Sequence, residues 1–289
     1  MLTNDRVQNH KLKGFCVCPR LLTDKEVTEL LREMDDICAG ATIANHEASR
    51  LEMEPNQGPQ GNKVRRIHEP CTYYEAFREL AESPKLVDSM VQLLGPDVLY
   101  SYSKINIKPA EIGSVVDWHQ DMAYGPLTNS SYEAVLIYLD DADVENGCLR
   151  VIPGCSHMLD HSLDGYFQGR ITEPFNASDS VAIEGERGTA VFFSGLTPHA
   201  SSINKSLRSR RTLIIGYRSA DAFPVYIGPM TVKADQFVRL VHGKASPFAR
   251  FDMNTVAIPR YPGTMSLYEL QELSRNRVQS EPQTAASNM

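Results

Sequence analysis

Hydrophobic residues recur with helical spacing in two segments near the N-terminus. In TDKEVTELLREMDDIC (23–38) the apolar side chains fall on one helical face, and Thr23 and Glu26 have the spacing of a capping box. SPKLVDSMVQLLGP (83–96) begins with Ser83 as a candidate cap followed by proline, and it ends in Gly-Pro. Both patterns predict helices that pack on a core.

The segment between these helices, residues 40–63, is polar and rich in glycine. It is long for a simple connection and too polar to form a core element. Two interpretations stay open: a mobile lid over a site, or a surface loop without a role.

After residue 98 the pattern changes to short runs of β-forming residues separated by Gly, Pro, Asn and Asp. The runs are VLYSYSKINIK (98–108), AVLIYL (134–139), CLRVI (148–152), TAVFFS (189–194) and TLIIGYR (212–218). Several short strands after helices predict a mainly β fold with flanking helices, as an antiparallel sandwich or a jelly roll.

The C-terminal part is less regular, and residues 220–265 show no clear period. SLYELQEL predicts a short helix, because Ser266 and Glu269 repeat the capping-box spacing. We therefore expect a single domain over residues 1–275, with an N-terminal helical buttress, and a disordered tail over 276–289.

Composition narrows the function. The net charge is -7, and no block of Lys and Arg is large enough to track a phosphate backbone, which argues against nucleic acid as the main partner. No apolar run approaches the roughly 20 residues needed to cross a membrane, and residues 1–13 are too polar for a signal peptide. The six cysteines contain no C-x-x-C pair and are predicted to be free thiols. We expect a cytoplasmic protein, monomeric or homodimeric, that acts on a small molecule.

The segment VVDWHQDMAYGP (115–126) carries the first candidate chemistry. If it is extended, His119 and Asp121 share one face and Gln120 takes the other. The alternative is a half-buried strand whose solvated face simply carries polar residues. His199 follows a predicted strand and turn, where a jelly roll can return its side chain to His119. Two histidines and a carboxylate form a facial triad, which suits non-heme Fe(II) oxygenases.

Arginines follow the second histidine. A co-substrate acid that supplies two electrons would need a guanidinium to grip its far carboxylate. Arg208, Arg210 and Arg211 lie downstream of His199.

Together these motifs resemble the phytanoyl-CoA dioxygenase family of Fe(II)- and 2-oxoglutarate-dependent oxygenases. The matching features are HQD followed by Tyr124, then ENGCLRVIPG, and PH followed by N-K-S and R-R-T. The resemblance covers about residues 12 to 220 and is strongest between 104 and 218. It implies a double-stranded β-helix core, that is, a cupin-like jelly roll, with Fe(II) as cofactor and 2-oxoglutarate and O2 as co-substrates.

The resemblance also implies roles for single residues. His119, Asp121 and His199 match the iron ligands. Arg210, eleven residues beyond the last histidine, matches the arginine that holds the distal carboxylate of 2-oxoglutarate. Ser201 matches a position that helps to hold the same carboxylate, while Arg208 and Arg211 are then interpreted as a solvated basic turn.

Further residues fall near family positions that reach the other side of the co-substrate. These are Lys104, Asn106 and Arg66. For Arg66 the competing interpretation is a surface arginine beside a strand.

Residues around the triad are candidates for contact with substrate or for packing of the pocket wall. They are Gln120, Trp118, Tyr124 and His157, and His161 belongs to the wall as well. PGCSHMLDHS departs from the family's PGSH pattern by an extra cysteine, which changes the local turn.

The implied reaction is hydroxylation of an unactivated C–H bond with release of succinate and CO2. Because the carboxylate of Asp121 is present, hydroxylation is favoured over halogenation, whereas desaturation, epoxidation and ring formation would use the same ligands. We expect a biosynthetic (secondary-metabolic) or catabolic small-molecule hydroxylase, with an acyl-CoA 2-hydroxylase as the alternative. Two other classes are a cupin-like metal enzyme that needs no Arg210 and a catalytically silent binding module.

Overall fold

The computed structural model describes residues 1–255 except 56, 112–113, 164–167, 226–234 and 254. The helix predicted from Ser266 and the tail predicted for 276–289 lie outside the described residues.

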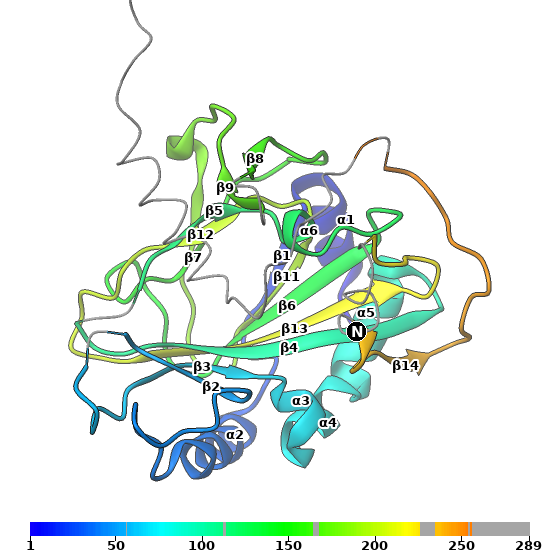
Figure 1. Cartoon of the computed structure of the whole chain (residues 1–289). Coiled ribbons are helices and arrows are strands. Elements are labelled where there is room, and N and C mark those ends of the chain that lie inside the picture. The colour runs from blue at the N-terminus through cyan, green and yellow to red at the C-terminus, as the bar shows by residue number, and fades with distance from the viewer. Residues whose placement is uncertain (56, 112–113, 164–167, 226–234, 254, 256–289) are drawn as a thin grey trace, which may run out of the picture.

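A large antiparallel sheet forms the centre of the molecule (Figure 1). Its strand order is β1-β11-β6-β13-β4-β3-β2, and β14 pairs with β4. The strands are β1 (Phe15–Cys18), β2 (Leu51–Met53), β3 (Val64–His68), β4 (Val98–Lys108), β6 (Tyr132–Tyr138), β11 (Ala190–Ser194), β13 (Arg210–Ser219) and β14 (Arg239–His242).

A smaller sheet lies over one face of the large one (Figure 1). Its order is β10-β7-β12-β5, from β10 (Val181–Ile183), β7 (Leu149–Val151), β12 (His199–Ser201) and β5 (Val116–His119). A separate hairpin joins β8 (His161–Leu163) to β9 (Gln168–Ile171). The two facing sheets are the jelly roll that the sequence predicts.

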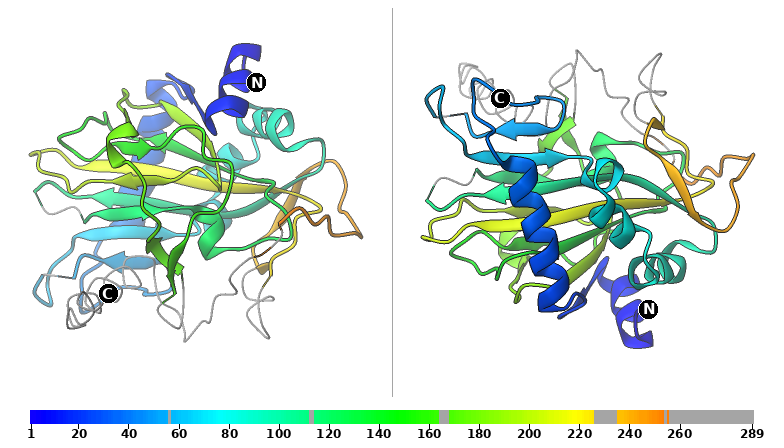
Figure 2. Two further views of the ribbon diagram at one scale, coloured as in Figure 1. Left: turned by 90° about the horizontal axis from the view of Figure 1, so that it is seen from above. Right: turned by 90° about the horizontal axis from the view of Figure 1, so that it is seen from below.

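Helices cover the opposite face of the large sheet, where α2 and α4 lie across its strands (Figure 2). The helices are α1 (Asn4–Lys13), α2 (Asp24–Cys38), α3 (Pro70–Tyr73), α4 (Glu75–Ala81), α5 (Pro84–Leu94), α6 (Asp121–Tyr124) and the 3-10 turn η1 (Ala177–Asp179). No helix among the described residues is long and apolar enough to cross a membrane.

Alternating side chains divide the interior into two layers. In β4, Ile105 and Ile107 pack into the layer between the sheet and the helices. Their neighbours Lys104, Asn106 and Lys108 line a cavity between the two sheets instead. Because side chains of a strand alternate, this run places polar groups inside the jelly roll. The candidate site lies on that face.

The long elements confirm the sequence prediction. Thr23 and Glu26 form the capping box at the start of α2, and β4 spans the predicted residues 98–108. Ser83 occupies the N-cap position of α5, but its hydroxyl donates to the carbonyl of Leu80 rather than to the helix.

The prediction that residues 40–63 contain no core element is wrong. Leu51–Met53 forms β2 and pairs with β3. Both Leu51 and Met53 are buried in the layer next to the helices. Two alternating apolar residues are too few to reveal a period in a polar segment.

Part of the unassigned region 220–265 also packs on the sheet. Arg239–His242 forms β14 along the edge of β4, and Arg250 pairs with Asp221 at 2.9 Å.

Candidate active site

Strand pairing brings the two predicted histidines together. His119 is the last residue of β5 and His199 the first of β12, and the two are direct partners across the antiparallel pair. Their ring centroids are 4.1 Å apart. Gln120 is extended (φ -120, ψ 134), so Asp121, at the start of α6, points to the same side as His119. The local geometry therefore confirms the shared face predicted from the spacing.

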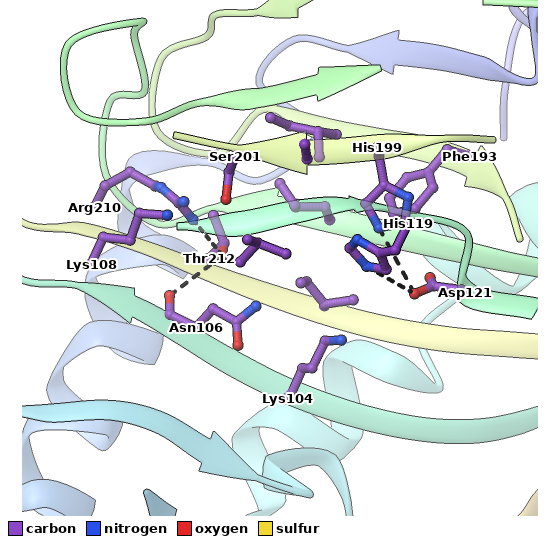
Figure 3. Close-up of a pocket in the computed structure, with 15 residues that line it drawn as sticks. Lys104, Asn106, Lys108, His119, Asp121, Phe193, His199, Ser201, Arg210 and Thr212 are labelled. Atoms are coloured by element: carbon purple, nitrogen blue, oxygen red, sulfur yellow. Dashed lines mark hydrogen bonds and ion pairs between the residues drawn. The ribbon is translucent and has the colours of Figure 1, made fainter. Parts of the chain in front are cut away.

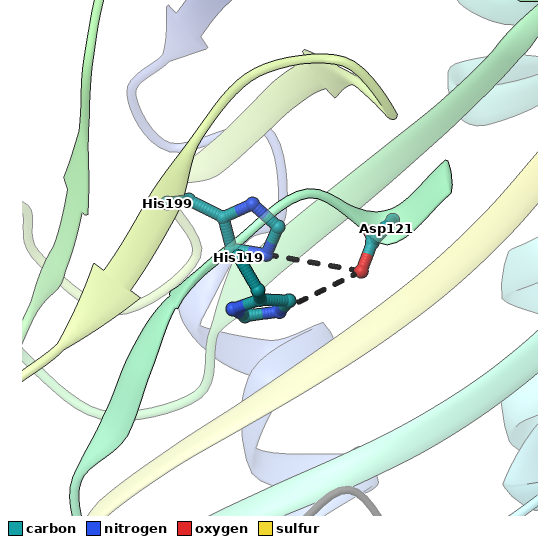
Figure 4. A group of neighbouring side chains, drawn as sticks. All are labelled: His119, Asp121 and His199. Atoms are coloured by element: carbon teal, nitrogen blue, oxygen red, sulfur yellow. Dashed lines mark ion pairs between the residues drawn. The ribbon is translucent and has the colours of Figure 1, made fainter. Parts of the chain in front are cut away.

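The three side chains converge on one point (Figure 4). Nε2 of His119 and Nε2 of His199 each lie 3.8 Å from Oδ1 of Asp121. The opposite ring nitrogens, Nδ1, donate to main-chain carbonyls, of Asp117 at 2.8 Å and of Thr197 at 3.0 Å. These hydrogen bonds fix the tautomer and leave both Nε2 lone pairs facing the carboxylate.

Burial keeps both imidazoles neutral. Burial and the neighbouring His199 hold the pKa of His119 well below its ordinary value. Burial also lowers the pKa of His199, although the charge of Asp121 partly opposes the shift. A neutral imidazole is the form that binds a metal. The donor set fits Fe(II): two nitrogens and one carboxylate on a single face, with the other coordination positions open.

The same cavity extends from the triad to a buried arginine (Figure 3). Arg210 is 4% exposed; it donates to Thr212 Oγ1 at 3.0 Å and to the carbonyl of Gly147 at 2.9 Å. Ser201 shares a face of β12 with His199, and its hydroxyl lies near the guanidinium (Figure 3). The cavity thus has a metal-ligating end and a guanidinium end, as the resemblance implies.

The neighbouring arginines point elsewhere. Arg211 belongs to β13, is half-buried and pairs with Asp140 at 2.6 Å, so the interpretation as a solvated basic turn is wrong for this residue. Arg208 is mostly exposed and pairs with Asp143, as that interpretation predicts. Neither lines the cavity.

Lys108 and Thr212 line the guanidinium end, although the sequence analysis did not select them. Lys108 is the partner of Arg210 across β4 and β13. Its ammonium donates to the carbonyls of Ser114 and of Ser202, the latter at 2.7 Å. Burial and the nearby Arg210 hold the pKa of Lys108 well below its ordinary value. Lys108 lies two residues after Asn106, and Thr212 lies two residues after Arg210. Because side chains of a strand alternate, this spacing could have predicted that both residues face the cavity.

Asn106 and Arg66 act as a pair. Asn106 lines the cavity, and its Oδ1 accepts from Nε of Arg66 at 3.0 Å. Arg66 is 4% exposed and lies 3.5 Å from Glu52, which contradicts the interpretation of a surface arginine. Arg66 does not line the cavity itself. It orients the Asn106 amide so that Nδ2 turns away from it, toward the cavity.

Lys104 lines the metal end of the cavity together with His119 and Asp121. Burial lowers the pKa of Lys104 to about 8, although the charge of Asp121 opposes the shift.

The residues predicted to contact substrate lie at different distances from the metal end of the cavity. The ring of Tyr124 lies 5.3 Å from the ring of His119, next to the metal end. Trp118 packs on Phe175 at 5.5 Å. His157 is exposed, and its main-chain carbonyl accepts from the amide of Gln120 at 2.8 Å.

Gln120 is fully buried between two triad residues and ties the 155–161 segment to the site. Its amide nitrogen donates to Leu196 at 2.5 Å, and its amide oxygen accepts from the main chain of Leu159 at 2.8 Å. Its own main-chain N–H donates to Nε2 of His161 at 3.3 Å. Gln120 is therefore a positioning residue for the ligands on either side.

Replacing Gln120 with leucine should weaken metal binding by about 10- to 100-fold, the range for groups that orient metal ligands. It should also cost about 2–3 kcal/mol of unfolding free energy, because several buried main-chain groups lose partners. Gln92→Leu is the matched control, since the Gln92 amide exchanges two hydrogen bonds with the main chain of Leu2, at the N-terminus. Urea unfolding and Fe(II) titration separate the two effects; equal metal affinity in both variants would contradict the positioning role.

The fold and the site define a class. A jelly roll with two histidines and an aspartate at one end of its cavity, and a buried arginine at the other, is the arrangement of a non-heme iron oxygenase that uses a keto acid.

Comparison with known proteins gives the family. The phytanoyl-CoA dioxygenase (PhyH) family matches residues 11–212, so the chain belongs to this family. A probable alpha-ketoglutarate-dependent hypophosphite dioxygenase of Stutzerimonas stutzeri is 31% identical over 88% of this chain and 90% of its own. The L-proline trans-4-hydroxylase of Streptomyces griseoviridis is 27% identical over 74% of this chain and 85% of its own.

Solved structures agree on the fold. EctD from S. alaskensis with bound Fe has a TM-score of 0.65 at 22% identity, covering 78% of this chain and 79% of that one. The chain is thus an Fe(II)- and 2-oxoglutarate-dependent dioxygenase with a mainly β, cupin-like fold, which confirms the predicted family, fold class, enzyme class and cofactors.

Proposed function

We propose that this dioxygenase hydroxylates a small polar molecule, with His119, Asp121 and His199 as iron ligands and Arg210 as the anchor of 2-oxoglutarate. The observation that carries the proposal is one cavity with the triad at one end and the Arg210 guanidinium at the other (Figure 3). A keto acid with two carboxylates complements both ends, because its keto-acid end chelates a metal and its far carboxylate pairs with a guanidinium.

The residues that line the cavity would bind the co-substrate and exclude water from the metal. When bound, Fe(II) supplies the redox chemistry that activates dioxygen. Arg210, with Ser201 and Thr212 nearby, would hold the distal carboxylate of 2-oxoglutarate, and Asn106 would offer an amide N–H to the co-substrate. His119 is only 2% exposed, so the chemistry would proceed away from bulk water.

The overall reaction balances without a further reactant. One atom of O2 enters the C–H bond as a hydroxyl group, and the other ends in succinate while C1 of 2-oxoglutarate leaves as CO2. The C–H bond and 2-oxoglutarate each supply two of the four electrons that O2 accepts. Retention of Asp121 favours hydroxylation; desaturation, epoxidation or ring formation would be alternative outcomes.

Two lines of support favour a small substrate over an acyl-CoA thioester. Several relatives are named for hypophosphite, ectoine and L-proline, which are far smaller than a CoA thioester, while another is named as a phytanoyl-CoA dioxygenase domain-containing protein. The metal end of the cavity is enclosed, with His199 only 7% exposed.

Composition supports a cytoplasmic location and a small-molecule partner. All six cysteines are free, which is typical of a reducing compartment such as the cytoplasm. The net charge of -7 argues against a nucleic-acid partner. Both a monomer and a homodimer are compatible with this proposal.

The test has two parts. Anaerobic addition of 2-oxoglutarate to the Fe(II)-loaded protein should produce the weak visible charge-transfer band of a chelated keto acid. Aerobic succinate release should then increase with one member of a panel of hypophosphite, methylphosphonate, L-proline, ectoine and phytanoyl-CoA. An increase in succinate release with phytanoyl-CoA alone would support the acyl-CoA alternative. A protein that binds no iron and shows no charge-transfer band would instead be a catalytically silent binding module.

A further inference from the structure

Lys104 lines the metal end of the cavity and, in the part of the chain that the structure describes, has no hydrogen-bond acceptor. It lies on the inward face of β4, and its ammonium points toward the region of Asp121 (Figure 3). Its ammonium lies 5.3 Å from the centroid of the Tyr102 ring, within the range of a cation–π contact. Lys108 lies four residues further along β4 on the same face, and its ammonium instead donates to two carbonyls.

Lys104 is part-buried, so its ammonium keeps some water, but no protein acceptor among the described residues replaces the hydration that it loses. Chains keep such a group where a ligand supplies the missing acceptor. The charge of Asp121 acts on Lys104, but this carboxylate would bind the metal in the loaded site.

Charge balance indicates what kind of ligand is missing. A divalent iron and Asp121 leave one positive charge, and Arg210 adds a second. The two carboxylates of 2-oxoglutarate offset both of these charges. Arg66 does not line the cavity, and it shares Glu52 with Arg65. Lys108 does line the cavity, but its ammonium donates to two carbonyls and Glu54 is a nearby carboxylate. The charge of Lys104 remains, and one negative charge on the substrate would balance it.

We propose that Lys104 binds an anionic group of the substrate, so that the substrate is a compact oxyanion such as a phosphonate, phosphinate or carboxylate. This rests on the proposed function, since it takes iron and 2-oxoglutarate as occupants of the same cavity. Lys104 is then a specificity-determining residue rather than an anchor of the co-substrate. The bond that reacts, C–H or P–H, then lies close to the anionic group of the substrate, because the ammonium and the triad line the same end of the cavity.

The experiment measures substrate binding separately from turnover. The anaerobic Fe(II)- and 2-oxoglutarate-loaded protein is titrated with hypophosphite, methylphosphonate and acetate, and with dimethyl methylphosphonate as the uncharged matched probe. Perturbation of the visible band gives a Kd for each probe. The proteins are wild type, Lys104→Met, Lys104→Arg and, as the control, Lys205→Met, an exposed lysine outside the cavity.

We expect at least one oxyanion, but not the neutral ester, to bind wild type. Lys104→Met should raise the Kd of that oxyanion about 10- to 100-fold, the effect of losing a charged hydrogen bond. Lys104→Arg should restore much of the affinity, and Lys205→Met should match wild type. The 2-oxoglutarate concentration needed for the band should be the same in all four proteins.

Three results would overturn the assignment. They are unchanged oxyanion binding in Lys104→Met, absence of oxyanion binding to wild type, and weaker 2-oxoglutarate binding in Lys104→Met, which would assign the lysine to the co-substrate. In each of these the wild-type band still appears, so the proposed function survives. A wild type without the band refutes the proposed function itself, and the role of Lys104 with it.

Discussion

Replacing His199 with alanine should abolish iron binding and turnover together. The triad offers one ligand atom from each side chain within 4.8 Å of the others, so loss of one imidazole leaves two ligands on a buried wall. Loss of a group that only orients a ligand costs about 10- to 100-fold in metal affinity, so loss of the ligand itself should exceed about 100-fold. Anaerobic Fe(II) titration, the 2-oxoglutarate band and succinate release should all fall to background.

Asp121→Asn tests the same site through charge instead of shape. The amide keeps the size of the side chain but removes the negative charge that the two Nε2 atoms face at 3.8 Å. Iron affinity should fall strongly here as well. His242→Ala is the control, since His242 is exposed on β14 and bonds through Nδ1 to the carbonyl of Pro96. If His199→Ala retains the iron content and the 2-oxoglutarate charge-transfer band of wild type, the metal binds at another site.

The elements that the sequence predicts well carry their own signals. α2 has a capping box and a continuous apolar face, and β4 is a long run of β-forming residues. β2, β5 and β12 have only three or four residues each. Such short strands form because a neighbouring strand pairs with them. Three or four residues are too few to show an alternation of apolar and polar side chains, so the sequence does not reveal these strands.

The same limit applies to the site. His119, Asp121, His199 and Arg210 stand in recognisable motifs, so spacing and resemblance could select them. Lys108 has no motif, and its place depends on the register that sets it opposite Arg210. The burial of Arg66 behind Asn106 likewise follows from the pairing of β3 with β4.

Arg210→Ala should raise the KM for 2-oxoglutarate about 100-fold, since removing one partner of a buried charge pair costs about 2–5 kcal/mol. The value of kcat at saturating 2-oxoglutarate should change much less, because the triad and Lys104 are untouched. Steady-state succinate release at varied 2-oxoglutarate, together with the concentration dependence of the anaerobic band, measures both.

Two variants separate co-substrate binding from folding. Arg210→Lys keeps the positive charge but loses the two-pronged geometry, so it should recover only part of the affinity. Arg208→Ala removes an exposed arginine two positions away, whose partner is Asp143, and should leave the KM unchanged. Thermal unfolding of Arg210→Ala is needed beside the kinetics, because the carbonyl of Gly147 loses its 2.9 Å donor.

The outcome for Arg210 also decides between classes of iron enzyme. If Arg210→Ala folds, binds iron and keeps the wild-type KM for 2-oxoglutarate, the guanidinium only supports Gly147 and Thr212. Lys108, on the neighbouring strand β4, would then be the cation left to hold the distal carboxylate. If turnover instead proceeds without 2-oxoglutarate, the chain would be a cupin-like oxygenase that kept the triad and lost the co-substrate. A KM effect confined to Arg210, with iron binding intact, is the result that the two-ended cavity predicts.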